Sequence, residues 1–128
     1  MTDNADLLRK GYVAFAAGDI ATLELMFHPE VVWHEPGTNP VSGVYKGWPS
    51  VVGLFVAYAE RSGGTFSASL QTVLADEEQA ISVAHVTGER NGRRLDQGDH
   101  LFCKIRDGKV TEARVFYHDQ AEVDAFWA

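Results

Sequence analysis

The chain changes its pattern once, at Ser62-Gly63-Gly64, and this change constrains the fold more than any other feature of the sequence. Before it, apolar residues recur at helical spacing except in one short stretch at 31–34. After it come four segments rich in β-branched and aromatic residues, at 65–75, 80–90, 93–106 and 109–118. The last three segments are joined by Asn91-Gly92 and Asp107-Gly108, pairs that suit the left-handed backbone of two-residue hairpin turns. We therefore expect a four-stranded antiparallel meander and an α+β fold, with helices first and strands later.

Local signals predict the remaining elements. In chain order they are a helix over residues 3–17, a short helix that Asp19 caps and Pro29 ends, a strand over residues 31–34, an irregular loop over residues 36–47, a helix from Pro49 to about Arg61, and a final helix that Asp119 caps together with Glu122.

Size and charge exclude several functions. The 128 residues fit one domain, 1–128. Eleven Lys and Arg against 18 Asp and Glu give a net charge of -7, and Arg93-Arg94 is the largest basic cluster, so we expect no nucleic-acid partner. The single Cys103 excludes an intrachain disulfide, and no spacing predicts a metal site or another cofactor. No apolar run approaches the ~20 residues that a membrane helix needs, and the N-terminus is polar, so we expect a soluble, cytoplasmic protein without a membrane partner.

Short motifs along the whole chain carry a family resemblance: Ala17-Gly18-Asp19, Trp33-His34-Glu35-Pro36-Gly37, the stretch 42–47, the stretch 106–110, and Asp119-Gln120. With this order of elements, the chain resembles the nuclear-transport-factor-2-like superfamily, and within it the ketosteroid-isomerase and SnoaL-like polyketide-cyclase branch. The resemblance implies a cone in which a curved, mainly antiparallel sheet wraps around the N-terminal helices, with a site in the open end. It also implies a homodimer through the outer face of the sheet, which apolar residues on both faces of residues 99–105 independently favour.

The resemblance places a catalytic base at Glu35. Ketosteroid isomerase has an Asp followed by Pro at the end of its first strand, and Glu35-Pro36 stands there in this chain. An apolar cavity would raise the pKa of that carboxyl and strengthen it as a base. The alternative is that Glu35 binds backbone amides of the following loop. His34 is a further candidate, but strand alternation lets only one of the two point inward, and we expect Glu35.

The strand over residues 93–106 offers two candidates for stabilising a developing enolate oxygen. A period of two makes them exclusive, because Asp99 shares a face with Leu101 and Cys103, whereas His100 shares a face with Phe102. Lys104 favours Asp99 facing inward. Phe102 and the resemblance favour His100, which we expect to face the site, with Asp99 as the alternative. The resemblance also makes Asp119 a candidate acid or base, although it can equally cap the last helix.

We expect an apolar wall around the substrate made of aromatic side chains: Tyr12, Trp33, Phe55, Tyr58, Phe102 and Tyr117. The leading hypothesis is a cofactor-independent acid/base enzyme, such as an isomerase, cyclase or lyase, acting on a small apolar carbonyl compound. One alternative is a non-catalytic protein that binds a small ligand in the same pocket. Another is an epoxide hydrolase, because Arg94-Leu95-Asp96 resembles the Arg-x-Asp motif of the limonene-type enzymes.

Overall fold

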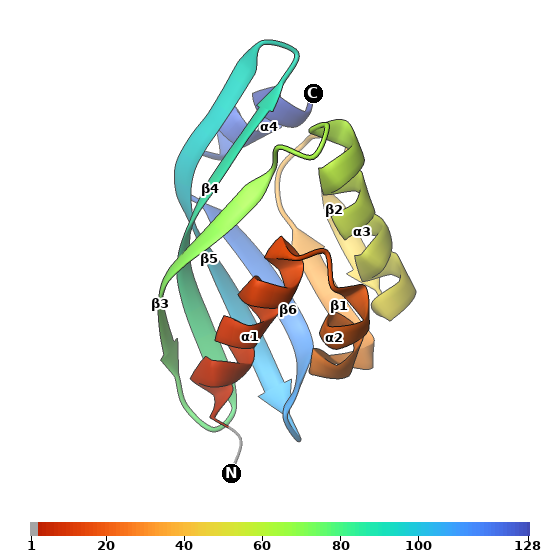
Figure 1. Ribbon diagram of the computed structural model, residues 1–128, viewed down its shortest axis with the longest axis vertical. Coiled ribbons are helices and arrows are strands. Elements are labelled where there is room, and N and C mark those ends of the chain that lie inside the picture. Colours follow the sequence, from red (N-terminus) through yellow and green to blue (C-terminus); the bar gives the residue numbers. More distant parts are fainter. Residues whose placement is uncertain (1–2) are drawn as a thin grey trace.

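The computed structural model describes residues 3–128 and has the α+β architecture that the sequence predicts (Figure 1). Its elements, in chain order, are α1 (Asn4–Ala16), α2 (Ile20–Met26), β1 (Phe27–Glu35), β2 (Gly43–Lys46), α3 (Trp48–Arg61), β3 (Ser67–Ala75), β4 (Gln79–Arg90), β5 (Arg93–Arg106), β6 (Lys109–Tyr117) and α4 (Gln120–Trp127).

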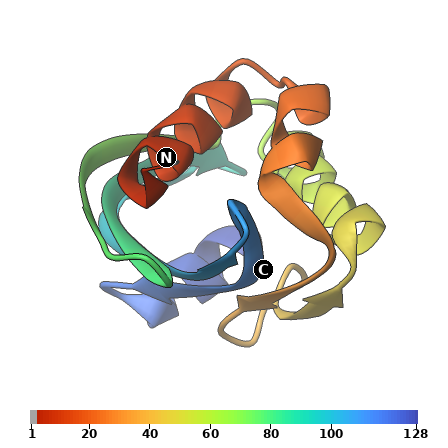
Figure 2. The same ribbon diagram turned by 90° about the horizontal axis from the view of Figure 1, so that it is seen from below.

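The strands form one curved six-stranded sheet in the order β2-β1-β6-β5-β4-β3. Every neighbouring pair is antiparallel except β1 and β6, which are parallel. The expected meander is therefore present as β3 to β6. Helix α1 packs against β3 and β4, whereas α2 and α3 pack against β1. Seen from below, the sheet curls around a centre that α1, α2 and α3 enclose from the other side (Figure 2). The molecule is thus a cone with its concave sheet face turned toward these helices.

The residues predicted to form the hairpin turns and helix caps do so in the structure. Asn91 and Gly92 have φ of 50° and 78°, and Asp107 and Gly108 have φ of 51° and 73°, so both hairpins use left-handed turn residues. The predicted caps Asp19 and Asp119 each accept a hydrogen bond from a backbone amide in the first turn of the helix that follows, and Asp3 does the same for α1.

The segment between α2 and α3 differs from its prediction. Strand β1 begins at Phe27 and includes Pro29, which was expected to end the preceding helix. The register of β1 against β6 shifts between Phe27 and Val32, so the missing amide hydrogen of Pro29 falls in an irregular stretch. Residues 43–46, expected to be loop, form the edge strand β2 and pair with β1. None of the helices within residues 3–128 is long and apolar enough to cross a membrane.

Candidate functional site

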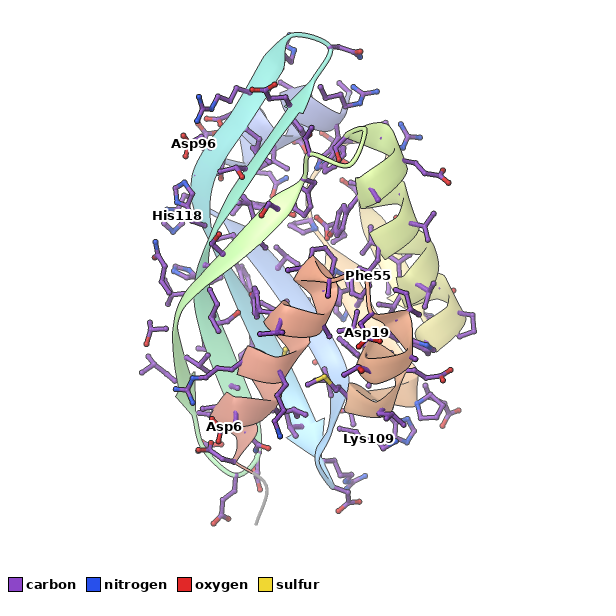
Figure 3. All side chains as sticks on the ribbon, viewed as in Figure 1. Asp6, Asp19, Phe55, Asp96, Lys109 and His118 are labelled. Atoms are coloured by element: carbon purple, nitrogen blue, oxygen red, sulfur yellow. The ribbon has the colours of Figure 1, made fainter. Side chains whose placement is uncertain are left out.

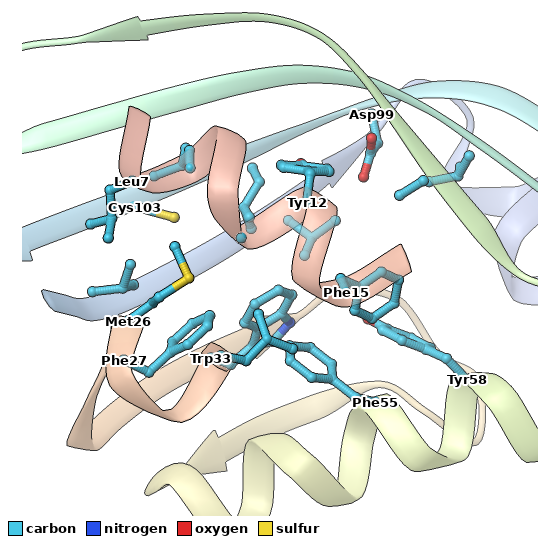
Figure 4. A pocket seen from close by; sticks show the side chains of 18 of the residues that line it. Leu7, Tyr12, Phe15, Met26, Phe27, Trp33, Phe55, Tyr58, Asp99 and Cys103 are labelled. Atoms are coloured by element: carbon cyan, nitrogen blue, oxygen red, sulfur yellow. The ribbon is translucent and has the colours of Figure 1, made fainter. Parts of the chain in front are cut away.

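A cavity of about 100 Å³ lies between the concave face of the sheet and helices α1, α2 and α3 (Figure 4). Apolar side chains from these helices and from the sheet make up most of its lining. Asp99 is the one lining residue with a charged side chain among those that the structure describes. The cavity therefore suits a small, largely apolar molecule with a single polar group.

Aromatic rings form the wall opposite Asp99. The ring centroids of Trp33 and Phe55 are 5.3 Å apart, and Phe27 lies 6.4 Å from each of them. Figure 4 shows these three rings on one side of the cavity, with Tyr12 and Asp99 on the other. Edge-on packing of this kind holds the rings in fixed orientations, so the wall is a rigid apolar surface.

Asp99 points into the cavity because of the strand period. On β5 the buried residues alternate, and Asp99 shares the inner face with Leu95 and Cys103. The residue is 7% exposed, and its Oδ1 atom has no hydrogen-bond partner. Burial raises the pKa of Asp99 from 3.8 to about 6, against a smaller lowering by His118 and His85. Asp99 is thus a carboxyl that can exchange a proton near neutral pH with a molecule in the cavity.

The same alternation corrects the prediction that His100 faces the site. His100 lies on the outer face of the sheet, where its ring centroid is 5.1 Å from that of His118. Figure 3 shows His118 on this outer side. Lys104, 60% exposed at its side chain, lies 3.7 Å from Glu112 on the same face. Burying a lysine in the apolar interior would be costly, so Lys104 determines which face of β5 points outward. Lys104 was therefore a more reliable signal than Phe102.

Phe102 shares this outer face, and its predicted place in the aromatic wall is wrong for the same reason. The other five aromatic residues predicted to surround the site do line the cavity: Tyr12, Trp33, Phe55, Tyr58 and Tyr117.

Glu35 is buried at the end of β1 and faces inward, as expected, while His34 faces outward. Its carboxyl accepts three hydrogen bonds, all from side chains. Oε1 accepts from Trp33 Nε1 at 3.1 Å and from the Tyr58 hydroxyl, and Oε2 accepts from the Tyr117 hydroxyl at 2.6 Å. These are side-chain donors, so the alternative of a carboxylate capping the loop amides is wrong.

Burial raises the pKa of Glu35 from 4.5 to about 7, although the three hydrogen bonds lower it. Its donors Trp33, Tyr58 and Tyr117 line the cavity, whereas Glu35 itself lies behind them. The carboxyl that the sequence favoured as the base is therefore one layer away from the cavity, and Asp99 is the carboxyl that faces it.

Glu35 lines a second, more open hollow of about 420 Å³ on the other side of this layer. Tyr117 lines both the hollow and the cavity. His34, Arg114 and Gln120 contribute polar side chains to the hollow. The pair formed by Glu35 and Tyr117 thus separates the cavity from the hollow.

Three other predicted site residues, a tyrosine, a histidine and an aspartate, have structural partners. Tyr12 shares a hydrogen bond of 2.6 Å with the buried Ser82, a partner that the sequence did not reveal, and burial raises its pKa. His34 lies 3.1 Å from Glu112 on the outer face. Asp119 caps α4, and its backbone is held by Gln97.

The remaining motif lies away from the cavity. Arg94 and Asp96 are 3.6 Å apart, and both side chains are at least half exposed. The set of two carboxylates and an arginine that an epoxide hydrolase requires is therefore not assembled in the cavity. Within residues 3–128, no three His, Cys, Asp or Glu side chains are grouped so that they could hold a metal ion.

Comparison with known proteins finds close relatives over the full length. A family model described as SnoaL-like domain matches residues 8–113. An uncharacterized protein of Mycobacterium tuberculosis is 36% identical over 131 residues, covering 100% of both chains. The solved structure of Bal32a, from a soil-derived mobile gene cassette, is 36% identical with a TM-score of 0.95, covering 98% of this chain and 96% of that one.

More distant structures share the fold. An NTF2-like protein of unknown function from Burkholderia pseudomallei has 17% identity and a TM-score of 0.88, covering 100% of this chain and 99% of that one. Proteins provisionally described as polyketide cyclases also have this fold, at 17% and 18% identity. The expected nuclear-transport-factor-2-like cone is confirmed.

Proposed function

The chain belongs to the SnoaL-like domain family, and on that premise we propose that it is a cofactor-independent enzyme that moves a proton on a small, largely apolar carbonyl compound. The observation that carries the proposal is Asp99, a buried carboxyl with an unpartnered oxygen that faces an otherwise apolar cavity.

The proposed step is a proton transfer at the carbon next to the carbonyl group. The Asp99 carboxylate takes a proton from this carbon, so that a C–H bond breaks and an O–H bond forms on Asp99. The electron pair of the broken bond moves toward the carbonyl oxygen and gives an enolate. Asp99 then returns the proton to the same carbon or to another one, and the carboxylate is regenerated.

The surroundings of Asp99 favour this chemistry. A base works best when its pKa lies near the pH of the reaction, and burial moves the pKa of Asp99 to about 6. The rings of Trp33 and Phe55 and the neighbouring side chains make the lining apolar, and an apolar environment strengthens electrostatic contacts between the carboxyl and a bound molecule. Of the tyrosines that line the cavity, Tyr117 is the candidate donor to the enolate oxygen, because Tyr12 shares its hydrogen bond with Ser82 and Tyr58 donates to Glu35.

The volume of the cavity limits the size of the substrate. An engineered apolar cavity of roughly 150 Å³ binds benzene, so about 100 Å³ favours one ring or a short chain. Cyclohexanone is a suitable probe because it has a single ring, one carbonyl group and exchangeable hydrogens on the adjacent carbons.

The test is the incorporation of deuterium into cyclohexanone in D₂O, followed by proton NMR. The wild-type protein should accelerate the exchange, and Asp99→Asn should reduce the acceleration by about 100-fold or more, which is typical of removing a general base. Asp96→Asn is the matched control, since it makes the same chemical change on the outer face of the same strand. Equal rates in wild type and Asp99→Asn would contradict the proposal. Saturable binding without any exchange would indicate a non-catalytic binding protein.

A further inference from the structure

The hydrogen bonds around Glu35 determine what the tyrosines can offer to a ligand. A tyrosine hydroxyl has one hydrogen, and an ionised carboxylate has none. When Glu35 is ionised, Tyr58 and Tyr117 both direct their single hydrogens to it. Neither hydroxyl can then donate a hydrogen bond into the cavity, even though both residues line it.

Protonation of Glu35 changes this at one tyrosine only. Oε1 already accepts from Trp33 and Tyr58, whereas Oε2 accepts from Tyr117 alone. The added hydrogen is therefore placed on Oε2, where it points along the 2.6 Å contact toward the Tyr117 oxygen. Tyr117 becomes the acceptor of that bond, and its own hydrogen is then free for another acceptor, such as a ligand in the cavity that it lines.

We propose that Glu35 and Tyr117 form a proton-controlled hydrogen-bond donor, in which protonation of Glu35 turns the Tyr117 hydroxyl toward the carbonyl oxygen of a bound ligand and ionisation of Glu35 withdraws it. Tyr117 is the residue that contacts the ligand, and Glu35 is a positioning residue that acts through Tyr117. The inference rests on the proposed function in one respect, namely that the ligand carries a carbonyl oxygen. It does not depend on Asp99 acting as a base.

The groups that face Glu35 favour protonation near neutral pH. Its hydrogen-bond partners are Trp33 on β1, Tyr58 on α3 and Tyr117 on β6. Asp99 on β5 and Tyr45 on β2 interact with it through charge. Three polar residues line the hollow beside it, namely His34 on β1, Arg114 on β6 and Gln120 on α4, and Asp124 on α4 binds the loop that follows it. Burial outweighs the hydrogen bonds, so the pKa of the carboxyl lies at about 7. The charge of Asp99 raises it further when that residue is ionised.

The hollow on the far side gives the proton a route that does not cross the cavity. Glu35 and Tyr117 both line this hollow of about 420 Å³. Glu35 can exchange its proton on the side of the hollow while the cavity holds a ligand. Binding of a carbonyl compound at a pH near or above the pKa of Glu35 should therefore be coupled to uptake of one proton.

The experiment measures binding of two ring probes between pH 5.5 and 8.5 by NMR titration of the Trp33 indole signal. Cyclohexanone accepts a hydrogen bond, and methylenecyclohexane has nearly the same shape but no acceptor oxygen. All variants carry Asp99→Asn, which removes the second carboxyl that titrates in the cavity and also removes the proposed chemistry. In this background the Kd of cyclohexanone should rise about tenfold as the pH increases through 7, the cost of about one hydrogen bond, while that of methylenecyclohexane stays constant.

Three additional substitutions assign the effect. With Glu35→Gln, the amide N–H replaces the carboxyl O–H toward Tyr117, so cyclohexanone should bind tightly at every pH. With Tyr117→Phe, binding should be weak at every pH. Tyr58→Phe is the matched control, and it should keep the pH dependence because Tyr58 stays bonded to Oε1 in both states.

The inference is overturned if cyclohexanone binds with the same Kd at all pH values, if the pH dependence survives Tyr117→Phe or Glu35→Gln, or if the alkene binds as tightly as the ketone throughout. Binding of neither probe overturns both the inference and the proposed carbonyl site. A wild-type protein that shows the pH-dependent binding but no deuterium exchange supports the inference and contradicts only the proposed function.

Discussion

Replacing Asp99 by Asn should stabilise the folded protein at pH 8, although the side chain is buried and the substitution is in the cavity. Asp99 has a higher pKa in the folded protein, about 6, than the ordinary 3.8. Between these two values the folded state binds more protons than the unfolded state, so the free energy of unfolding decreases as the pH rises. The asparagine side chain has no proton to lose and does not contribute to this decrease.

The magnitude follows from the two pKa values. Well below pH 3.8 both states are protonated and Asp99 contributes no pH dependence. Above pH 7 the cost of ionising the buried carboxyl is the pKa difference of about 2 multiplied by 1.36 kcal/mol, or about 3 kcal/mol. At pH 4 an unfolded carboxyl with a pKa of 3.8 is already more than half ionised. The difference in unfolding free energy between Asp99→Asn and wild type should therefore change by about 2.5 kcal/mol from pH 4 to pH 8, in favour of the variant. For a chain of this length this corresponds to about 10 °C in Tm.

Thermal unfolding followed by circular dichroism at pH 4, 6 and 8 measures this change. Asp96→Asn is the control: the hydrogen bond to His85 lowers the pKa of the Asp96 carboxyl from 3.8, so this residue titrates below pH 4. The Tm difference between Asp96→Asn and wild type should therefore change little between pH 4 and pH 8. If the Tm difference between Asp99→Asn and wild type is the same at pH 4 and pH 8, Asp99 is not a desolvated carboxyl, and its proposed role as a base loses its physical reason.

Two further predictions concern assembly and the loop after Glu35. Phe116 is 54% exposed on the outer face of the sheet, and we predict a homodimer through this face. Light scattering should give a dimer mass for wild type and a monomer mass for Phe116→Lys, and a wild-type monomer at tens of micromolar would contradict the prediction. Gly37→Ala should lower the unfolding free energy by about 2 kcal/mol or more in urea titrations. At this position φ is 98°, and the added Cβ would collide with Asp124 Oδ1, which accepts hydrogen bonds from Thr38 and Asn39. Gly53→Ala in α3 meets no atom within 4 Å and should instead stabilise by about 0.5–1 kcal/mol; equal effects at both positions would refute the steric argument.

Local signals predicted most elements of the fold because the residues concerned act within a few positions along the chain. Asp19 binds the amide of Thr22, and Asp107-Gly108 adopts a turn that depends on those two residues alone. Strand β2 was missed for the complementary reason. Residues 43–46 form a strand because β1 lies beside them. The segment is only four residues long and its neighbours include several Gly and Pro, so its sequence alone does not indicate that pairing.

The site was predicted less completely than the fold. Strand alternation correctly placed Glu35 inward and reduced the choice on β5 to Asp99 or His100. Phe102 favoured an inward His100, whereas Lys104 favoured an inward Asp99. The cost of burying Lys104 is the larger effect, so Asp99 faces inward. Phe102 remains half-buried on the outer face, because an apolar side chain at a sheet surface costs little.

The environment of Glu35 could not be predicted from the sequence. Its two tyrosine partners lie 23 and 82 residues away along the chain. The register that brings β6 beside β1, and the packing of α3 on the sheet, together place both hydroxyls on one carboxyl. Tyr58 and Tyr117 were recognised as candidates, but their joint use by Glu35 depends on tertiary structure.

The central claim is that the Asp99 carboxyl faces the cavity without a partner and meets the ligand there. The most direct measurement is a pH titration of the ¹³C carboxyl signal of Asp99 by NMR, without and with cyclohexanone. We expect a midpoint of about 6 in the free protein and a clear displacement of the midpoint when the ketone is bound. A midpoint at or below 3.8 that cyclohexanone leaves unchanged would contradict the claim, because it would describe a solvated or paired carboxylate outside the binding site.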